Sequence, residues 1–216
     1  MDNTPFIITP ASILLVGPSS SGKSQLLAYM LKNMEKCFDK PIKAIYLAYS
    51  RQQPLYAKMR QDSQVPFTLI RGLPDDLNVT PGSILVIDDL MGQDSDKIAE
   101  IFTKDSHHKN YTVVYIVQSL FNKNPYHRVI SLNSQYMILL SNPRDKSQIL
   151  HLAKQVNPEN PHFVVDAYRQ ATSRKYGYLV INFRIDCPEE LRLRDNVLGG
   201  AGVYYDLKRA ERFQID

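Results

Sequence analysis

Eight consecutive residues at positions 17–24 have the types and the spacing of a phosphate-binding loop. They match the pattern GxxxxGK[ST] at every fixed position. The eight are Gly17, Pro18, Ser19, Ser20, Ser21, Gly22, Lys23 and Ser24. The glycines let the backbone curl so that its N–H groups face phosphate oxygens, while the lysine reaches the β- and γ-phosphates and the serine hydroxyl ligates Mg²⁺. We therefore predict that this segment binds ATP and Mg²⁺, although a serine-rich turn can match by chance.

A second set of candidate residues ends an apolar run further along the chain. Residues 84–87 are Ile, Leu, Val and Ile, and Asp88 and Asp89 follow them directly. Two adjacent carboxylates are costly to bury unless a cation lies between them, which favours a metal site over a simple turn. We predict that Asp88 holds Mg²⁺ through a water molecule and that Asp89 orients or deprotonates the attacking water.

A third polar position, Gln118, follows the apolar run Thr112–Val117. A glutamine at such a strand end can contact the γ-phosphate or the attacking water. On its own this residue has the features of a surface glutamine that opens a loop. Because it follows the Asp88–Asp89 strand by one helix and one strand, we predict that it senses hydrolysis.

These residues depend on strands that alternate with helices. Apolar, β-branched runs predict strands at 12–16, 43–48, 67–70, 83–88, 112–117, 136–140 and 178–183. Helical spacing predicts helices at 23–37, 55–61, 96–104, 146–156 and 161–171. This alternation implies a mainly parallel sheet with right-handed crossovers. With the motifs, it predicts an α/β fold: a three-layer P-loop NTPase of the additional-strand, RecA-like type, with helices on both sides of the sheet.

Composition limits the remaining possibilities. The 216 residues suit one domain (1–216), with a core at about 12–184 and a C-terminal extension at 185–216. We expect irregular structure at Arg71–Gly82 and at the glycine-rich Leu198–Tyr205. The net charge of +4 is concentrated in residues 1–60 and 111–183, on either side of an acidic segment at 61–110. A basic surface can attract nucleic acid, but scattered lysines exposed to solvent are the simpler interpretation.

The cysteines and the hydropathy pattern argue for an intracellular protein. Cys37 and Cys187 are the only cysteines, and the five histidines have no zinc spacing, so we expect reduced, structural thiols. No run approaches the roughly 18 apolar residues of a membrane span, and the stretch before the phosphate loop is more typical of a buried strand than of a signal peptide. We therefore expect no contact with a membrane.

Seven separated blocks carry a resemblance to a known family. The blocks are Gly17–Ser24, Ile87-Asp88-Asp89-Leu90-Met91, Ser106-His107-His108-Lys109-Asn110, Val117-Gln118-Ser119-Leu120-Phe121, Arg128-Val129-Ile130-Ser131-Leu132-Asn133, Asn142-Pro143-Arg144-Asp145 and Tyr176-Gly177-Tyr178-Leu179. In this order they resemble the poxvirus-type genome-packaging ATPases of the FtsK–HerA superfamily. The chain looks closest to the branch found in Polinton (Maverick) elements, adintoviruses and virophages. The resemblance covers roughly residues 12–195.

The resemblance implies an ATP-driven motor that assembles as a ring, usually a hexamer, and moves double-stranded DNA into a viral capsid. It implies a place inside the infected host cell, in the nucleus or the cytoplasm, or in association with the virion. Two departures stand out. Many members have Asp-Glu where this chain has Asp88 and Asp89, and many carry an arginine where this chain has His108 and Lys109. That arginine acts on the ATP of a neighbouring subunit.

The missing arginine leaves Arg128 and Arg144, from later blocks, as candidates for the cation that acts in trans, with Lys109 after them. The paired residues His107 and His108 are more consistent with a helix cap or a surface stack than with a role at a subunit interface.

Two other functions remain open. One is a nucleotide-binding module that contacts DNA or the capsid with little turnover, against which Asp88, Asp89 and Gln118 argue. The other is a small-molecule P-loop kinase, whose arginine-bearing lid would have to come from Arg169 and Arg174.

Overall fold

The predicted strands pair into a single sheet in the computed structural model, which describes residues 6–90, 95–121, 124–144, 146–198, 202–207 and 211–215. Within these ranges the sheet has ten strands in the order β10-β9-β8-β7-β6-β1-β5-β4-β2-β3. They are β1 (Ser12–Val16), β2 (Ile45–Tyr49), β3 (Phe67–Arg71), β4 (Ile84–Asp88), β5 (Thr112–Val117), β6 (Tyr136–Leu140), β7 (Tyr178–Asn182), β8 (Leu193–Arg194), β9 (Gly202–Asp206) and β10 (Glu211–Ile215). The six strands from β6 to β3 are parallel, whereas β6 to β10 pair antiparallel.

The strand order explains how the predicted motifs meet. β5 lies between β1, which precedes the phosphate loop, and β4, which ends in Asp88. This inserted strand confirms the additional-strand arrangement. The register pairs Val16 with Val117 and Asp88 with Ile116, so all three strands end at one edge of the sheet. Every residue of β1, β4 and β5 is buried, as expected for strands covered on both faces.

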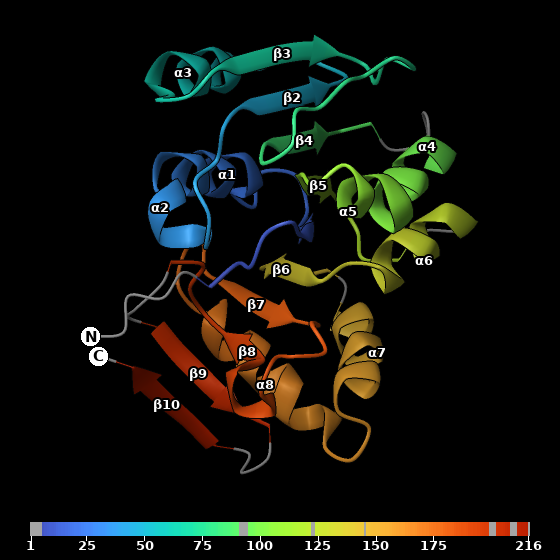
Figure 1. Cartoon of the computed structure of the whole chain (residues 1–216). Coiled ribbons are helices and arrows are strands. Elements are labelled where there is room, and N and C mark those ends of the chain that lie inside the picture. The colour runs from blue at the N-terminus through green and yellow to red at the C-terminus, as the bar shows by residue number, and fades with distance from the viewer. Residues whose placement is uncertain are drawn as a thin grey trace.

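Helices cover both faces of the sheet and form the outer layers (Figure 1). Alternate strand residues point to opposite faces, so Ile13 and Leu15 join one apolar cluster while Leu14 and Val16 join the other. The first cluster includes side chains of α1 (Lys23–Lys32), α2 (Met34–Cys37) and α3 (Pro54–Asp62). The second includes side chains of α4 (Ser95–Glu100), the π-helical turn η1 (Ile101–Asp105), α6 (Pro125–Leu132), α7 (Lys146–Val156) and α8 (Pro161–Ala171). The short elements α5 (Ser106–His108) and η2 (Glu189–Leu191) complete the described helices.

Several predicted boundaries were wrong. The helix predicted at 23–37 is two helices divided at Asn33, and α6 was not predicted. The stretch Leu198–Tyr205 was expected to be irregular, yet β9 begins at Gly202. Met91, Asp145 and positions 199–201 of that stretch lie outside the described residues. The segment Arg71–Gly82 is irregular after the end of β3, as predicted.

The strands β8, β9 and β10 extend the sheet beyond the last predicted strand. Charged residues in these strands obscured the strand pattern, because a charged side chain normally indicates an exposed position. Arg194 is nevertheless only 1% exposed. Its guanidinium lies 4.5 Å from the centre of the Phe6 ring and 4.8 Å from that of Tyr204. It also donates hydrogen bonds to the Tyr204 hydroxyl (2.8 Å) and the Leu198 carbonyl (2.6 Å). Burial lowers the pKa of Arg194, because it disfavours the charged form. The contacts with Phe6, Tyr204 and Leu198 offset the cost of burying this cation.

Both cysteines are free, with Cys37 buried and Cys187 half-buried. Among the helices in the described ranges, none combines the length and the apolar character needed to cross a bilayer.

Candidate nucleotide site

The phosphate loop connects β1 to α1, and its two glycines are required by its shape. A Cβ on Gly17 would lie 2.6 Å from the Ser21 Oγ. Gly22 has a φ of 104°, a conformation that side chains disfavour, and a Cβ there would lie 2.8 Å from the Tyr176 ring. The local sequence therefore folds into a curled loop that only glycines allow at these two positions.

The curled loop presents free donors to its concave side. In the described part of the chain, the backbone N–H groups of Ser19, Ser20, Gly22, Lys23 and Ser24 donate no hydrogen bond. Those of Lys23 and Ser24 also begin α1, where the helix leaves its first N–H groups unpaired and places its positive dipole end. An array of this kind is an anion site and suits the phosphates of ATP.

One further loop donor is buried. The hydroxyl of Ser21 has no partner among the residues that the structure describes. An unpartnered buried hydroxyl is unfavourable, so an anion in the loop would satisfy it.

Lys23 lies within the loop that it is predicted to serve. Its Nζ donates to the carbonyl oxygens of Gly17 at 2.6 Å and Pro18 at 2.8 Å. Partial burial lowers the pKa of Lys23, while the nearby charges of Asp88 and Asp89 oppose that shift. The two carbonyls hold the ammonium beside the unpaired amides, from which its flexible stem can reach a bound phosphate.

Asp88 ends β4 as predicted, but its nearest partner was not predicted. Its carboxylate is 5% exposed and accepts a hydrogen bond of 2.6 Å from the hydroxyl of Tyr56 on α3. Burial raises the pKa of Asp88, and the charge of Asp89 adds to this; the Tyr56 hydrogen bond and the charge of Lys23 act against it. Tyr56 has no exposed surface, and its pattern in the sequence is that of an ordinary core position. We infer that Tyr56 orients Asp88.

Asp89 lies just beyond the strand and is exposed. Its φ of 57° is unusual for a non-glycine residue and lies where the chain leaves β4. It accepts hydrogen bonds from the Ser50 hydroxyl (3.3 Å) and the Gln118 side-chain amide (3.5 Å). The structure thus brings the predicted pair Asp89 and Gln118 together. Ser50 was missed, although its place directly after β2, the neighbour of β4, could have indicated it.

Gln118 begins a segment that α7 holds in place. The side-chain carbonyl of Gln148 accepts hydrogen bonds from the backbone of Leu120 (3.0 Å) and Phe121 (3.4 Å). The Ser119 hydroxyl is also within 3.2 Å of this oxygen.

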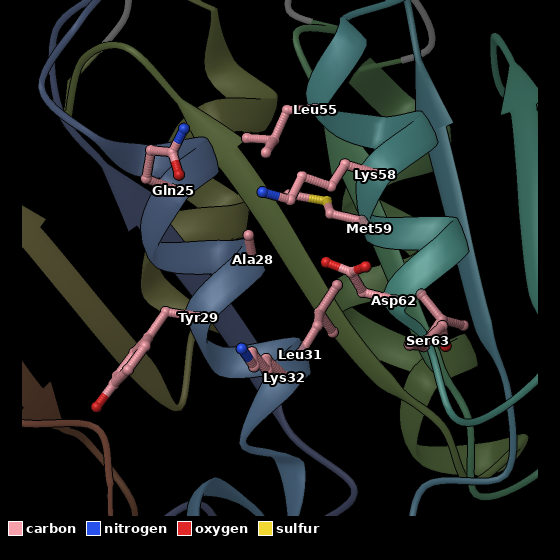
Figure 2. Close-up of a pocket in the computed structure, with 11 residues that line it drawn as sticks. Gln25, Ala28, Tyr29, Leu31, Lys32, Leu55, Lys58, Met59, Asp62 and Ser63 are labelled. Atoms are coloured by element: carbon pink, nitrogen blue, oxygen red, sulfur yellow. The ribbon is translucent and has the colours of Figure 1, made fainter.

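The side chains of Lys23, Asp88, Asp89 and Gln118 face a single cavity of about 620 Å³ at the carboxyl edge of the sheet. It is lined by Ser19, Ser20, Gly22, Lys23, Ser24, Gln25, Gln53, Pro54, Leu55, Asp88, Asp89, Ile116, Gln118 and Tyr176. A smaller cavity of about 250 Å³ runs between α1 and α3 and shares Gln25 and Leu55 with the first (Figure 2). Of the predicted catalytic residues, the larger cavity contains Lys23, Asp88, Asp89 and Gln118, and it is the candidate site.

The residues present suit ATP and Mg²⁺. The free amides and Lys23 supply donors for phosphates, while Ser24 and Asp88 supply the oxygen ligands that Mg²⁺ prefers. Within the described ranges, no group of three or more His, Cys, Asp or Glu side chains could hold a metal by itself.

The structure does not bring the predicted arginines into the cavity. Arg128 lies exposed on α6, and Arg144 lies exposed between β6 and α7. Lys109 forms an ion pair of 2.6 Å with Asp105 outside the cavity. Of the described lining residues, Lys23 is the one cation.

No protein-family model matches the sequence, and no curated protein matches it significantly. Among solved structures, the chain is similar over its whole length to 98% of the genome packaging NTPase B204 from Sulfolobus turreted icosahedral virus 2, solved with ATP-gammaS (13% identity, TM-score 0.43). It is also similar to the Legionella pneumophila ATPase DotB over 77% of this chain and 53% of that one (12% identity, TM-score 0.38).

A third similar structure is Thermomonospora curvata EccC (ATPases 2 and 3), solved with a signal sequence peptide. The match covers 96% of this chain and 36% of that one, with 12% identity and a TM-score of 0.43. Matches this distant do not bear on the activity of the chain.

Proposed function

We propose that the chain is an ATPase that binds ATP with Mg²⁺ in the 620 Å³ cavity and hydrolyses it. One observation carries this proposal: the unpaired amides and Lys23 of the phosphate loop share a cavity with Asp88, Asp89 and Gln118. Bound Mg²⁺ would neutralise the charge of the phosphates and polarise them.

Each residue then has a distinct role. Lys23 binds the terminal phosphates, and Ser24 and Asp88 hold the metal. Asp89, exposed and oriented by Ser50 and Gln118, accepts a proton from the attacking water. Gln118 responds when the terminal phosphate is lost, since it contacts Asp89 directly.

We further propose that hydrolysis drives double-stranded DNA into a viral capsid, and that the chain works as a ring, expected to be a hexamer, inside the infected cell. The seven matching sequence blocks support the translocase. The scarcity of cations among the described cavity residues supports the ring, because phosphoryl transfer gains about 10³–10⁵ in rate from an added arginine. A neighbouring copy would supply that cation, and Arg128 and Arg144 are the candidates.

Steady-state ATP hydrolysis with and without double-stranded DNA tests the proposal, with Lys23→Ala as the control. We expect DNA to stimulate turnover and Lys23→Ala to abolish it. Slow turnover that DNA does not change would favour the nucleotide-binding module with little turnover. Phosphate transfer to a nucleoside would favour the small-molecule kinase. Unchanged hydrolysis by Lys23→Ala would overturn the assignment of the loop.

The mass of the protein in solution with ATP and Mg²⁺ tests the ring separately. A multiple of the 24.8 kDa chain mass is expected. A monomer under all nucleotide conditions, with full turnover, would count against a shared site.

A further inference from the structure

The cavity has an aromatic residue at the end opposite its acids. Tyr176 belongs to the turn between α8 and β7, and β7 pairs antiparallel with β6 so that Tyr178 lies opposite Leu140. The start of β7 therefore lies at the edge where the parallel strands end, beside the phosphate loop. In the strand order, β6, β1 and β5 separate β7 from β4, which carries Asp88.

The ring of Tyr176 is held near the loop yet remains open to solvent. Its Cδ1 would lie 2.8 Å from a Cβ on Gly22, so the ring packs against the loop backbone just before Lys23. The residue is nevertheless 57% exposed and lines the cavity. Its φ of 62° places a bulky residue in the left-handed region, a conformation that costs on the order of 1–3 kcal/mol and is concentrated at ligand sites.

We propose that Tyr176 is the platform on which the base of a purine nucleotide stacks. The proposal rests on the proposed function, because the direction of the nucleotide follows from it. A triphosphate with its terminal phosphate toward Asp88 and Asp89 crosses the amides of the loop and leaves its nucleoside at the far end. The exposed ring of Tyr176 is the aromatic surface lining that end of the cavity.

A stacking interaction of this kind predicts that removing the ring weakens the binding of ATP but not of a phosphate chain without a base. Base–aromatic stacking contributes about 1–3 kcal/mol by alanine substitution. At about 1.4 kcal/mol per tenfold change, Tyr176→Ala should weaken ATP binding by about 5- to 150-fold. It should leave the binding of inorganic tripolyphosphate, which has no base, unchanged. Tyr176→Phe keeps the ring and should bind ATP almost as the natural chain does.

Calorimetric titration of the full chain with Mg²⁺ and either ATP or tripolyphosphate measures this difference. Tyr29→Ala is a matched control, because Tyr29 is also a half-exposed tyrosine (45%) but points away from α3 on the far side of α1 (Figure 2). Tyr176→Asn provides a second variant if the alanine form folds poorly, since asparagine tolerates a positive φ.

A spectroscopic test is independent of affinity. The chain has no tryptophan, so Tyr176→Trp introduces a single reporter at the proposed platform. ATP should quench its emission and tripolyphosphate should not, while Tyr29→Trp should respond to neither.

The outcomes separate this inference from the proposed function. Equal losses of ATP and tripolyphosphate binding by Tyr176→Ala would show that the ring only shapes the loop, and would overturn the inference. ATP binding that is unaffected by the variant would also overturn it, while leaving the ATPase intact. If the natural chain binds neither molecule, the proposed function itself fails.

Discussion

Replacing Tyr56 with phenylalanine removes a single hydroxyl group from the interior of the candidate site. That hydroxyl donates to the Asp88 carboxylate at 2.6 Å, and both side chains are buried. Phenylalanine keeps the ring, including its contact with Tyr49 at 5.5 Å between ring centres. The change therefore isolates the hydrogen bond and creates almost no cavity.

The magnitude follows from the charge of the acceptor. A hydrogen bond to a charged group contributes about 1.5–3 kcal/mol, roughly twice the contribution of a neutral one. We expect Tyr56→Phe to lower the free energy of unfolding by about 1.5–3 kcal/mol near neutral pH and without nucleotide.

The loss of unfolding free energy in Tyr56→Phe should depend on pH, in a direction set by the pKa of Asp88. Burial raises this pKa in the folded protein, so the contribution of Asp88 to stability is present at low pH and is lost as the pH rises through its folded pKa. The Tyr56 hydrogen bond limits that loss by stabilising the charged form. The difference between Tyr56→Phe and the natural chain should therefore be largest at neutral pH and should shrink on acidification.

Urea unfolding at several pH values measures both effects. The control is Tyr46→Phe, which removes an exposed, neutral hydrogen bond of 3.2 Å to Thr80 and should cost less than about 1 kcal/mol at every pH. A Tyr56→Phe deficit that equals the control, or that stays constant on acidification, would refute the link between Tyr56 and a charged Asp88.

Three further predictions concern turnover. Asp89→Asn should bind ATP and Mg²⁺ almost normally but hydrolyse ATP at least ~100-fold more slowly. Asp88→Asn should instead raise the Mg²⁺ requirement. If the two variants behave alike, Asp89 and Asp88 do not have separate roles as base and metal ligand. Gln118→Ala loses a contact with Asp89 and should reduce DNA-stimulated turnover more than ATP affinity, and a loss of affinity alone would indicate a binding role. If Arg128 or Arg144 acts in trans, its alanine variant should bind ATP and oligomerise without turnover. Mixing that variant with Lys23→Ala should restore activity, and mixtures that stay inactive would exclude these residues.

Much of the parallel half of the sheet could be predicted from local patterns. Continuous apolar runs such as those of β1, β4 and β5 have one stable place, which is a sheet covered on both faces. Once these runs are strands, the polar residue after each of them must lie at the carboxyl edge. The proximity of Asp89 to Gln118 was therefore predictable although 29 positions separate them.

In the antiparallel half, β7 was predicted but β8, β9 and β10 were not, because their stability depends on pairing that the sequence does not show locally. β8 has two residues, and Arg194 within it would ordinarily indicate exposure. It is buried because its guanidinium lies against the rings of Tyr204, ten positions along the chain, and of Phe6, which is distant in sequence. Only the folded arrangement shows that a charged residue there is compatible with a strand.

The two ends of the candidate site also differ in how far local sequence patterns predict them. Binding phosphate requires backbone amides, a cation and acids for a metal, and few residue types at fixed local spacings provide them, so Lys23 and Asp88 could be identified from sequence. Orienting a carboxylate or stacking a base requires only a hydroxyl or an aromatic ring, and many elements can supply either. Tyr56 comes from α3 and Tyr176 from the turn before β7. Tyr176 falls in one of the seven matching blocks, but neither tyrosine belongs to a phosphate- or metal-binding motif. Sequence motifs therefore locate the reaction, whereas the residues that orient it and bind the nucleoside depend on the long-range packing of the sheet.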